Sequence, residues 1–130
     1  MIAQLTEQLF LSGENEIHDV DKLKEFGITA ILNVGYQVTS PNYKDFLMVK
    51  IGLHEFSSNP DFFKSLAVDI LSRLIDNKQK VLIHCHAGAH RSPYIAFRYL
   101  AEKNNKTLDE VYQEMIPKVP WGIVYPHNIQ

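Results

Sequence analysis

The stretch VLIHCHAGAHRSP, residues 81–93, brings together side chains that could do chemistry. Cys85 is the only cysteine in the chain, Arg91 follows it six positions later, and Ser92 comes next. VLIHC has the composition of a buried strand, and Pro93 suits the first turn of a helix, so the residues between them are expected to form a tight loop. Such a loop presents successive backbone N–H groups to one point, where they bind an oxyanion such as phosphate.

Three residues would make this loop a phosphate site with a nucleophile at its base. Gly88 lets the backbone turn without a side chain in the way. The guanidinium of Arg91 can hold two phosphate oxygens as a planar fork. The same positive field favours the thiolate form of Cys85. The pattern therefore predicts a phosphatase that works through a cysteinyl-phosphate.

Length and composition limit the kinds of protein that this chain could be. At 130 residues it is long enough for one core but too short for two, so we expect a single domain over residues 1–130. A net charge of −2 gives no general attraction to nucleic acid or to an anionic membrane, and no apolar run approaches the length of a membrane span. The first ten residues lack the basic and then apolar order of a signal peptide, and one cysteine cannot form an internal disulfide. We therefore expect a cytoplasmic protein with a free thiol and without a nucleic-acid or membrane partner.

Strands and helices alternate along the sequence, which predicts an α/β fold. We expect a central, mostly parallel, twisted sheet flanked by helices, with the phosphate loop between a central strand and the following helix. Loops at the carboxyl ends of such strands are where ligands bind. The predicted strands cover residues 2–5, 8–11, 28–34, 46–53 and 80–85, and the predicted helices cover 18–28, 59–76, a segment from Pro93, and 107–117.

Some other residues carry specific structural expectations. Asn59 and Pro60 predict the start of the helix over 59–76, with Asn59 as its cap. We expect Phe62 and Phe63 to belong to the core rather than to a platform for substrate. Trp121 is either a core residue or part of the rim of a pocket.

The motif of His84 and Cys85, five residues, and then Arg91 and Ser92 resembles the His-Cys-x5-Arg-Ser/Thr signature of the protein tyrosine phosphatases. HCHAGAHRSP is most similar to the small dual-specificity branch, in which Ala-Gly lies in the loop and Ser follows the arginine. The segments LFLSG, GITAILNVG, the helix before VLIHC, and TLDEVYQEM with the later YPHN resemble the elements of that family in the same order. The resemblance implies a dual-specificity phosphatase-like catalytic domain over nearly the whole chain.

The resemblance also implies a role for each residue of the motif. Cys85 would be the nucleophile, and Arg91 would hold the phosphate and the transition state. Ser92 would hydrogen-bond Cys85 and ease its departure from the phosphoenzyme, while His84 would orient the loop from behind. Asn33 is either a supporting residue or a turn residue at the end of its strand. The amides that line the cradle would be those of His86, Ala87, Gly88, Ala89, His90 and Arg91.

The general acid is where the sequence departs from the family. The family uses an aspartate on a neighbouring loop, and alignment of FLMVKIGLHEF places Glu55 at that position. A glutamate can do the same work, but its extra methylene changes its reach. Asp61 is the nearest aspartate, although an acidic residue in a first helical turn also simply complements the helix dipole. We expect Glu55 to be the acid, with Asp61 and then His54 as alternatives.

Other interpretations stay open on the sequence alone. His84, His86 and His90 have a spacing that suits a metal site, but further ligands are hard to find, and we expect neither a metal nor a cofactor. A phosphate- or phosphopeptide-binding module with weak turnover is the alternative of a different class, because the acid lies at an unusual position. The same chemistry on RNA 5′-phosphates or phosphoinositides is a further alternative, although the loop lacks the lysines of the lipid-directed relatives.

The expected partner is a phosphorylated protein. It would carry phosphotyrosine, with phosphoserine or phosphothreonine as the alternative. Loop 35–45 is the expected wall facing this substrate, and the sequence gives no indication of the oligomeric state.

Overall fold

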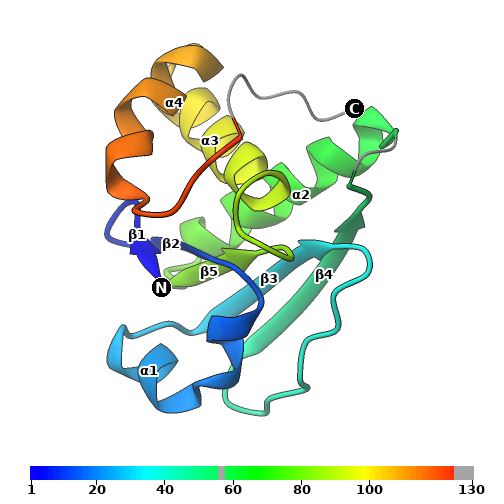
Figure 1. Ribbon diagram of the computed structural model, residues 1–130, viewed down its shortest axis with the longest axis vertical. Helices are drawn as coiled ribbons and strands as arrows, with labels where there is room; N and C mark the ends of the chain where they lie inside the picture. The colour runs from blue at the N-terminus through cyan, green and yellow to red at the C-terminus, as the bar shows by residue number, and fades with distance from the viewer. Residues whose placement is uncertain (56–57, 125–130) are drawn as a thin grey trace.

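The alternation of strands and helices predicted from the sequence is confirmed in the computed structural model, which describes residues 1–55 and 58–124 (Figure 1). The first half of the chain forms β1 (Ala3–Gln4), β2 (Leu9–Ser12), the 3-10 helix η1 (Asn15–His18), α1 (Val20–Glu25), β3 (Ala30–Gly35) and β4 (Leu47–Leu53). The second half forms α2 (Asp61–Asp76), β5 (Val81–His84), α3 (Arg91–Asn104), α4 (Leu108–Met115) and the 3-10 helix η2 (Ile116–Lys118). The YPHN motif at 125–128 lies outside the described residues.

The strands of the described residues form one mixed sheet in the order β1-β2-β5-β3-β4. β2, β5, β3 and β4 run parallel, and β1 pairs antiparallel with β2 at one edge. β5 therefore lies at the centre of the sheet, between β2 and β3. The prediction of a mostly parallel sheet, with the Cys85 loop between a central strand and the following helix, is confirmed.

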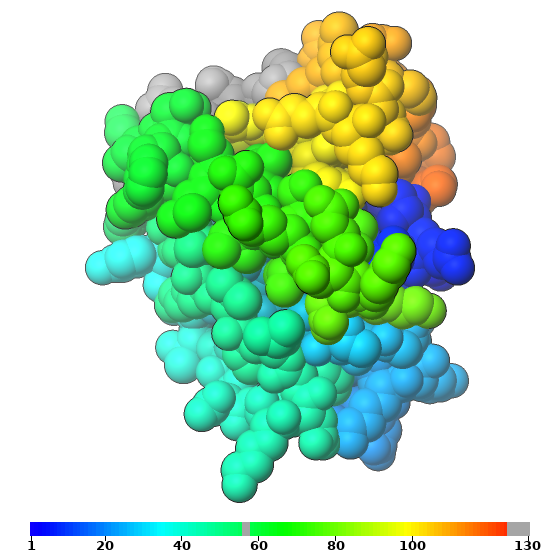
Figure 2. All heavy atoms as spheres, turned by 180° about the vertical axis from the view of Figure 1, so that it is seen from behind, coloured from blue at the N-terminus to red at the C-terminus, as the bar shows by residue number. Residues whose placement is uncertain are grey.

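Helices cover both faces of the sheet. Successive residues of a strand point to opposite faces, so each strand contributes side chains to two core clusters. In β3, Leu32 belongs to a larger core cluster and Ile31 to a smaller one, and Ile83 and Leu82 of β5 divide in the same way. The larger cluster is shared with α2, α3 and α4, and the smaller one with η1 and α1 (Figure 1). From behind, the side chains of α2 form a band across the surface, below those of α3 (Figure 2).

Local sequence explains where several helices begin and end. The side chain of Asp19 accepts a backbone N–H at the start of α1, and Gly27, with φ of 77°, follows its end. Thr107 and Glu110 form a capping box at the start of α4. Pro93 lies in the first turn of α3, where a proline is tolerated. No helix in the described part of the chain is long and apolar enough to cross a membrane.

The start of α2 differs from the prediction in two ways. Asn59 does not cap the helix: the N-cap is Pro60, and the Asn59 side chain instead bonds to the backbone of His54. Phe62 and Phe63 are 69% and 42% exposed, so the expectation that they belong to the core is wrong. The physical reason is that the fully buried positions of α2 begin only at Ala67, which leaves the first turn outside the core.

Candidate active site

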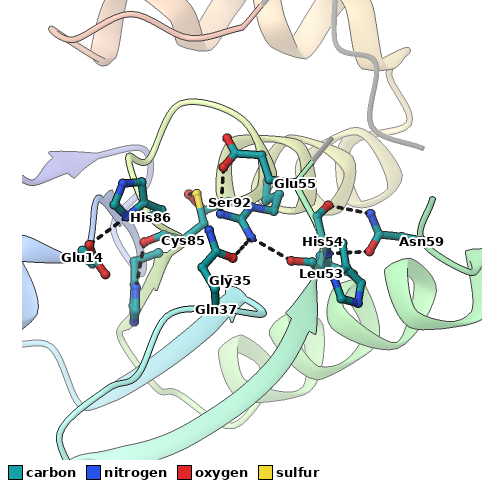
Figure 3. Close-up of polar contacts among 12 residues, drawn as sticks. Glu14, Gly35, Gln37, Leu53, His54, Glu55, Asn59, Cys85, His86 and Ser92 are labelled. Carbon is teal, nitrogen blue, oxygen red and sulfur yellow. Dashed lines mark hydrogen bonds and ion pairs between the residues drawn. The ribbon is translucent and has the colours of Figure 1, made fainter. Parts of the chain in front are cut away.

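The carboxyl ends of the parallel strands meet at one edge of the sheet, and the residues that follow them form the candidate site (Figure 3). Glu14 comes shortly after β2, Gln37 after β3, Glu55 after β4, and Cys85 directly after β5. The strands are in register at this edge, because β2 and β3 both pair with β5 up to His84. The sheet therefore gathers side chains that are as much as 71 residues apart in the sequence.

The loop over residues 85–91 joins β5 to α3, with Cys85 at its base. Cys85 is buried, and its Sγ atom lies 3.2 Å from the Oγ atom of Ser92. Gly88 has φ of 72°, and a Cβ atom on it would lie 2.7 Å from the carbonyl oxygen of Ser12. The loop therefore packs against the end of β2 in a conformation that favours glycine.

Carbonyl oxygens of this loop are hydrogen-bonded by groups that lie outside it. The bonds are His84 Nδ1 to the Cys85 carbonyl at 3.2 Å, Glu14 N–H to His86 at 2.9 Å, Trp121 Nε1 to Gly88 at 2.9 Å, and Val124 N–H to Ala89 at 2.8 Å. The C=O and the next N–H of a trans peptide point in opposite directions. The amides of residues 86, 87, 89 and 90 therefore point away from these outer groups.

Arg91 is fully buried at the first turn of α3. Its Nη1 atom donates to Oε1 of Gln37 at 2.7 Å and to the carbonyl oxygen of Leu53 at 2.8 Å, and its Nη2 atom lies 3.5 Å from Oε2 of Glu55. Its Nε atom has no hydrogen-bond partner among the described residues. A buried cation that keeps a free donor is suited to an anionic ligand, because an unsatisfied buried donor otherwise costs free energy.

His84 and Asn33 belong to one hydrogen-bond network behind the loop. The Nε2 atom of His84 lies 3.2 Å from the Oγ atom of Ser40, and Nδ2 of Asn33 donates to the same Oγ atom at 3.3 Å. Burial lowers the pKa of His84 below its usual value of 6.5, although the bond to the Cys85 carbonyl opposes this shift. The neutral ring donates from Nδ1 to that carbonyl and accepts the Ser40 hydroxyl at Nε2.

His86 turns its side chain out of the loop toward the end of β2 (Figure 3). Its Nδ1 atom lies 2.7 Å from Oε1 of Glu14. The imidazole is 57% exposed, so this contact is a surface ion pair only when His86 is protonated. The side chain of His86 therefore serves to join the loop to the residues after β2.

The three candidates for the general acid lie in different surroundings. Glu55 reaches Arg91, and its side chain is 26% exposed. Asp61 is 80% exposed, and its carboxylate lies 3.8 Å from Nη1 of Arg98 on α3. The ring of His54 stacks on that of Tyr36, with 4.1 Å between the centroids. Among the described contacts of these three candidates, only that of Glu55 reaches a residue of the Cys85–Arg91 loop.

Several residues at the site were not identified from the sequence. Gln37 and the Leu53 carbonyl hold Arg91, and Asn59 bonds to the backbone next to Glu55. Gln37 lies in loop 35–45. The expectation that this loop forms a wall of the site was the only indication in the sequence that Gln37 would be near it. Trp121 is partly buried, and its bond to Gly88 places it behind the loop as well as against the core.

The histidines do not form a metal site with other ligands in the described residues. No group of three or more His, Cys, Asp or Glu side chains is arranged there to hold a metal ion. His84 is bonded to Ser40 and to the Cys85 carbonyl, and His86 faces Glu14. The donors at this site therefore suit an anion rather than a cation.

Comparison with known proteins finds similarity along most of the chain. The family model described as "Dual specificity phosphatase, catalytic domain" matches residues 9–121. Dual specificity protein phosphatase 14 of Mus musculus is 30% identical over 113 residues, which cover 85% of this chain and 57% of that protein. The protein of the same name from Homo sapiens is 31% identical with the same coverage. The chain thus spans little more than half the length of these relatives.

Solved structures show the same fold. The crystal structure of human DUSP28 superposes with a TM-score of 0.83 at 16% identity, covering 96% of this chain and 85% of that chain. A mouse protein described as a "putative dual specificity phosphatase", solved in complex with zinc tungstate, has a TM-score of 0.84 at 17% identity, covering 96% and 79% of the two chains. With the family model matching most of its length, this chain belongs to the family of dual specificity phosphatase catalytic domains.

Proposed function

We propose that the chain is a cysteine-dependent protein phosphatase that hydrolyses phosphate monoesters through a cysteinyl-phosphate intermediate. The observation that carries the proposal is the guanidinium of Arg91, which is buried beside the loop of Cys85 and keeps Nε without a partner in the described residues. Gln37 and Leu53 hold its Nη1 atom, so Nε, together with the N–H of Nη2 that is not directed at Glu55, is left for two phosphate oxygens.

In the first step, the thiolate of Cys85 attacks phosphorus, and the bond from phosphorus to the leaving oxygen breaks. Glu55 gives its proton to that oxygen, so the product leaves as a neutral alcohol or phenol. Arg91 and the loop amides from His86 to Arg91 hold the remaining phosphate oxygens as their charge changes in the transition state. Glu55 lies 3.5 Å from Arg91, whereas the described ion pair of Asp61 is with Arg98, and this supports Glu55 over Asp61 as the acid.

In the second step, water attacks the phosphorus of the cysteinyl-phosphate, and the sulfur–phosphorus bond breaks. Glu55, now ionised, takes a proton from the water, and inorganic phosphate is released. The Ser92 hydroxyl, 3.2 Å from Sγ, would donate a hydrogen bond to the departing thiolate. His84 and Asn33 act from behind the loop, through the Cys85 carbonyl and Ser40.

The proposed substrates are phosphorylated proteins, and the proposed setting is the cytoplasm, with residues 1–130 acting as one catalytic domain. The names of the curated relatives support a protein substrate. The stacked rings of Tyr36 and His54 lie next to Gln37 and Glu55, and they support phosphotyrosine because an aromatic leaving group can pack on them. Tungstate, with which the mouse protein was solved, is a tetrahedral oxyanion like phosphate. Neither the family nor this geometry favours a binding module or an RNA or lipid substrate.

The test is hydrolysis of p-nitrophenyl phosphate by the wild-type chain and by Cys85→Ser. Wild type should release p-nitrophenol and be inhibited by vanadate, while Cys85→Ser should have no turnover and still bind inorganic phosphate in calorimetry. Thermal unfolding of both proteins serves as the folding control. Turnover near wild type in Cys85→Ser would overturn the mechanism. A panel of phosphopeptides, RNA 5′-phosphates and phosphoinositides then tests the substrate class.

A further inference from the structure

The chain after η2 returns to the phosphate loop and bonds to it twice. Lys118 donates from Nζ to the carbonyl oxygen of Leu5 at 3.0 Å, and Val119 is buried, so the start of this segment is fixed to the core. Trp121 then donates from Nε1 to the Gly88 carbonyl at 2.9 Å, and the Val124 N–H donates to the Ala89 carbonyl at 2.8 Å. Two successive carbonyls of the loop are therefore held by one segment from outside.

The Gly88–Ala89 peptide follows the one residue of the loop over 85–91 that has a positive φ. Gly88 has φ of 72°, and glycine reaches positive and negative φ almost equally well, so its own backbone does little to fix the next peptide plane. The end of β2 restricts this residue on one side, since a Cβ atom there would lie within 2.8 Å of Ser12 and Gly13 atoms. The indole of Trp121 bonds to the Gly88 carbonyl and fixes the direction of that peptide plane.

We infer that Trp121 is a positioning residue of the phosphate loop, which holds the Ala89 amide in the orientation that binds the anion. A trans peptide points its C=O and its N–H in opposite directions, so the Gly88 carbonyl bonded to Trp121 turns the Ala89 N–H away from the indole. The Val124 N–H does the same for the His90 amide through the Ala89 carbonyl. This inference rests on the proposed function, because it assigns a task within the same anion site.

The consequence concerns anion affinity. Loss of the indole donor frees the Gly88 carbonyl, and the Ala89 N–H is then no longer held toward the phosphate. The hydrogen bond from the Ala89 N–H to the phosphate is weakened for the substrate and for the transition state alike, so KM should rise with little change in kcat. The Ala89 N–H remains present and loses only its support, so the change in affinity should be that of an ordinary hydrogen bond, about 3- to 10-fold, rather than the larger loss of a whole bond to a charged group.

The experiment replaces Trp121 with phenylalanine, which keeps an aromatic ring and removes the N–H. For Trp121→Phe, the inhibition constants of inorganic phosphate and vanadate, and the KM for p-nitrophenyl phosphate, should each rise about 3- to 10-fold. Gly122→Ala is the matched control in the same stretch of chain, because a Cβ atom there meets nothing within 4 Å. It should leave these constants unchanged. Equal anion affinity in wild type and Trp121→Phe would overturn the inference.

A second measurement uses the fact that Trp121 is the only tryptophan of the chain, so its indole N–H gives a single NMR signal. Titration of the wild-type protein with inorganic phosphate should shift this signal, and an unshifted signal at saturating phosphate would contradict the inference even if Trp121→Phe fails to fold. Biosynthetic replacement by benzothienylalanine, which has sulfur in place of the N–H, should reproduce the loss of affinity. Failure of wild type to bind phosphate at all would instead overturn the proposed function, and this inference with it.

Discussion

Asn59 holds the backbone of His54 by two hydrogen bonds. Its Oδ1 atom accepts the His54 N–H at 2.6 Å, and its Nδ2 atom donates to the His54 carbonyl at 2.9 Å (Figure 3). Asn59 is buried, and His54 lies between Leu53, whose carbonyl bonds Arg91, and Glu55. The side chain of Asn59 thus fixes the main chain from which the proposed acid extends.

Asn59→Ala should lower kcat for phenyl phosphate by about 10- to 100-fold, because small displacements of a catalytic group cost factors of this size. The loss should be smaller for p-nitrophenyl phosphate, whose leaving group needs no proton. Asn59→Asp keeps an acceptor for the His54 N–H and should fall between wild type and alanine. Asn77→Ala, which removes a similar bond to the Arg73 carbonyl at the other end of α2, is the control. An equal loss on both substrates would show that Asn59 does not affect turnover by positioning the general acid.

Ser92→Ala should separate the two chemical steps. The variant keeps Cys85, the proposed nucleophile, but removes the hydroxyl that lies 3.2 Å from Sγ, so the phosphoenzyme should form and then break down slowly. Stopped-flow measurement of p-nitrophenol release should show a burst followed by a slow phase. Ser92→Thr, which keeps a hydroxyl, should restore steady turnover. Uniformly slow release without a burst in Ser92→Ala would argue against this role.

His84 should make the free energy of unfolding depend on pH. Burial lowers its pKa in the folded state below the usual 6.5, so below that pH the unfolded chain binds a proton that the folded chain does not bind. Stability should therefore be lost as pH falls through 6.5, by at most about 1.4 kcal/mol per pH unit for this single group. Urea unfolding between pH 8 and pH 5.5 measures the slope. His84→Gln should reduce this slope, and identical slopes in wild type and His84→Gln would contradict the assignment.

The contiguous part of the site could be predicted from the sequence because its chemistry depends on local spacing. One short segment contains the buried strand, the loop with Gly88 and the arginine of the following helical turn. These parts lie within ten residues of one another, so a local pattern is enough to predict all three. The same holds for the sheet, since alternating strands and helices leave few arrangements for a chain of this length. Roles of the individual side chains are still predictions, which the variants above address.

The remaining contacts depend on packing between distant segments, which no local pattern encodes. Asn59 precedes a proline at the start of a helix and so has the signature of a cap, but tertiary structure brings it to His54, where both of its polar groups are used. Gln37 and Trp121 contact the loop 54 and 33 residues away in sequence, respectively. Phe63 has helical spacing with the core positions of α2, but the helix begins before the core does.

The last prediction tests which residue is the general acid. If Glu55 is the acid, Glu55→Gln should lower turnover of alkyl or phenyl phosphates by roughly 10²–10⁴, the usual effect of losing a positioned acid. The loss should be smaller for p-nitrophenyl phosphate. In the pH–rate profile, the limb on which activity falls with rising pH should flatten, because that limb reports the acid losing its proton. Glu55→Asp shortens the side chain by one methylene and should keep the limb at reduced kcat.

Asp61→Asn is the matched comparison, because it neutralises a carboxylate that lies beside Arg98 instead of Arg91. It should cost about 0.3–1 kcal/mol of stability at the start of α2, where an acidic residue complements the helix dipole, and should leave the rate unchanged. The reverse pattern, with a flattened limb in Asp61→Asn and an intact one in Glu55→Gln, would show that the aspartate is the acid. A profile unchanged in both variants would leave His54 or water as the proton donor. His54→Gln then distinguishes the two, because it should flatten the limb only if the His54 side chain is the donor.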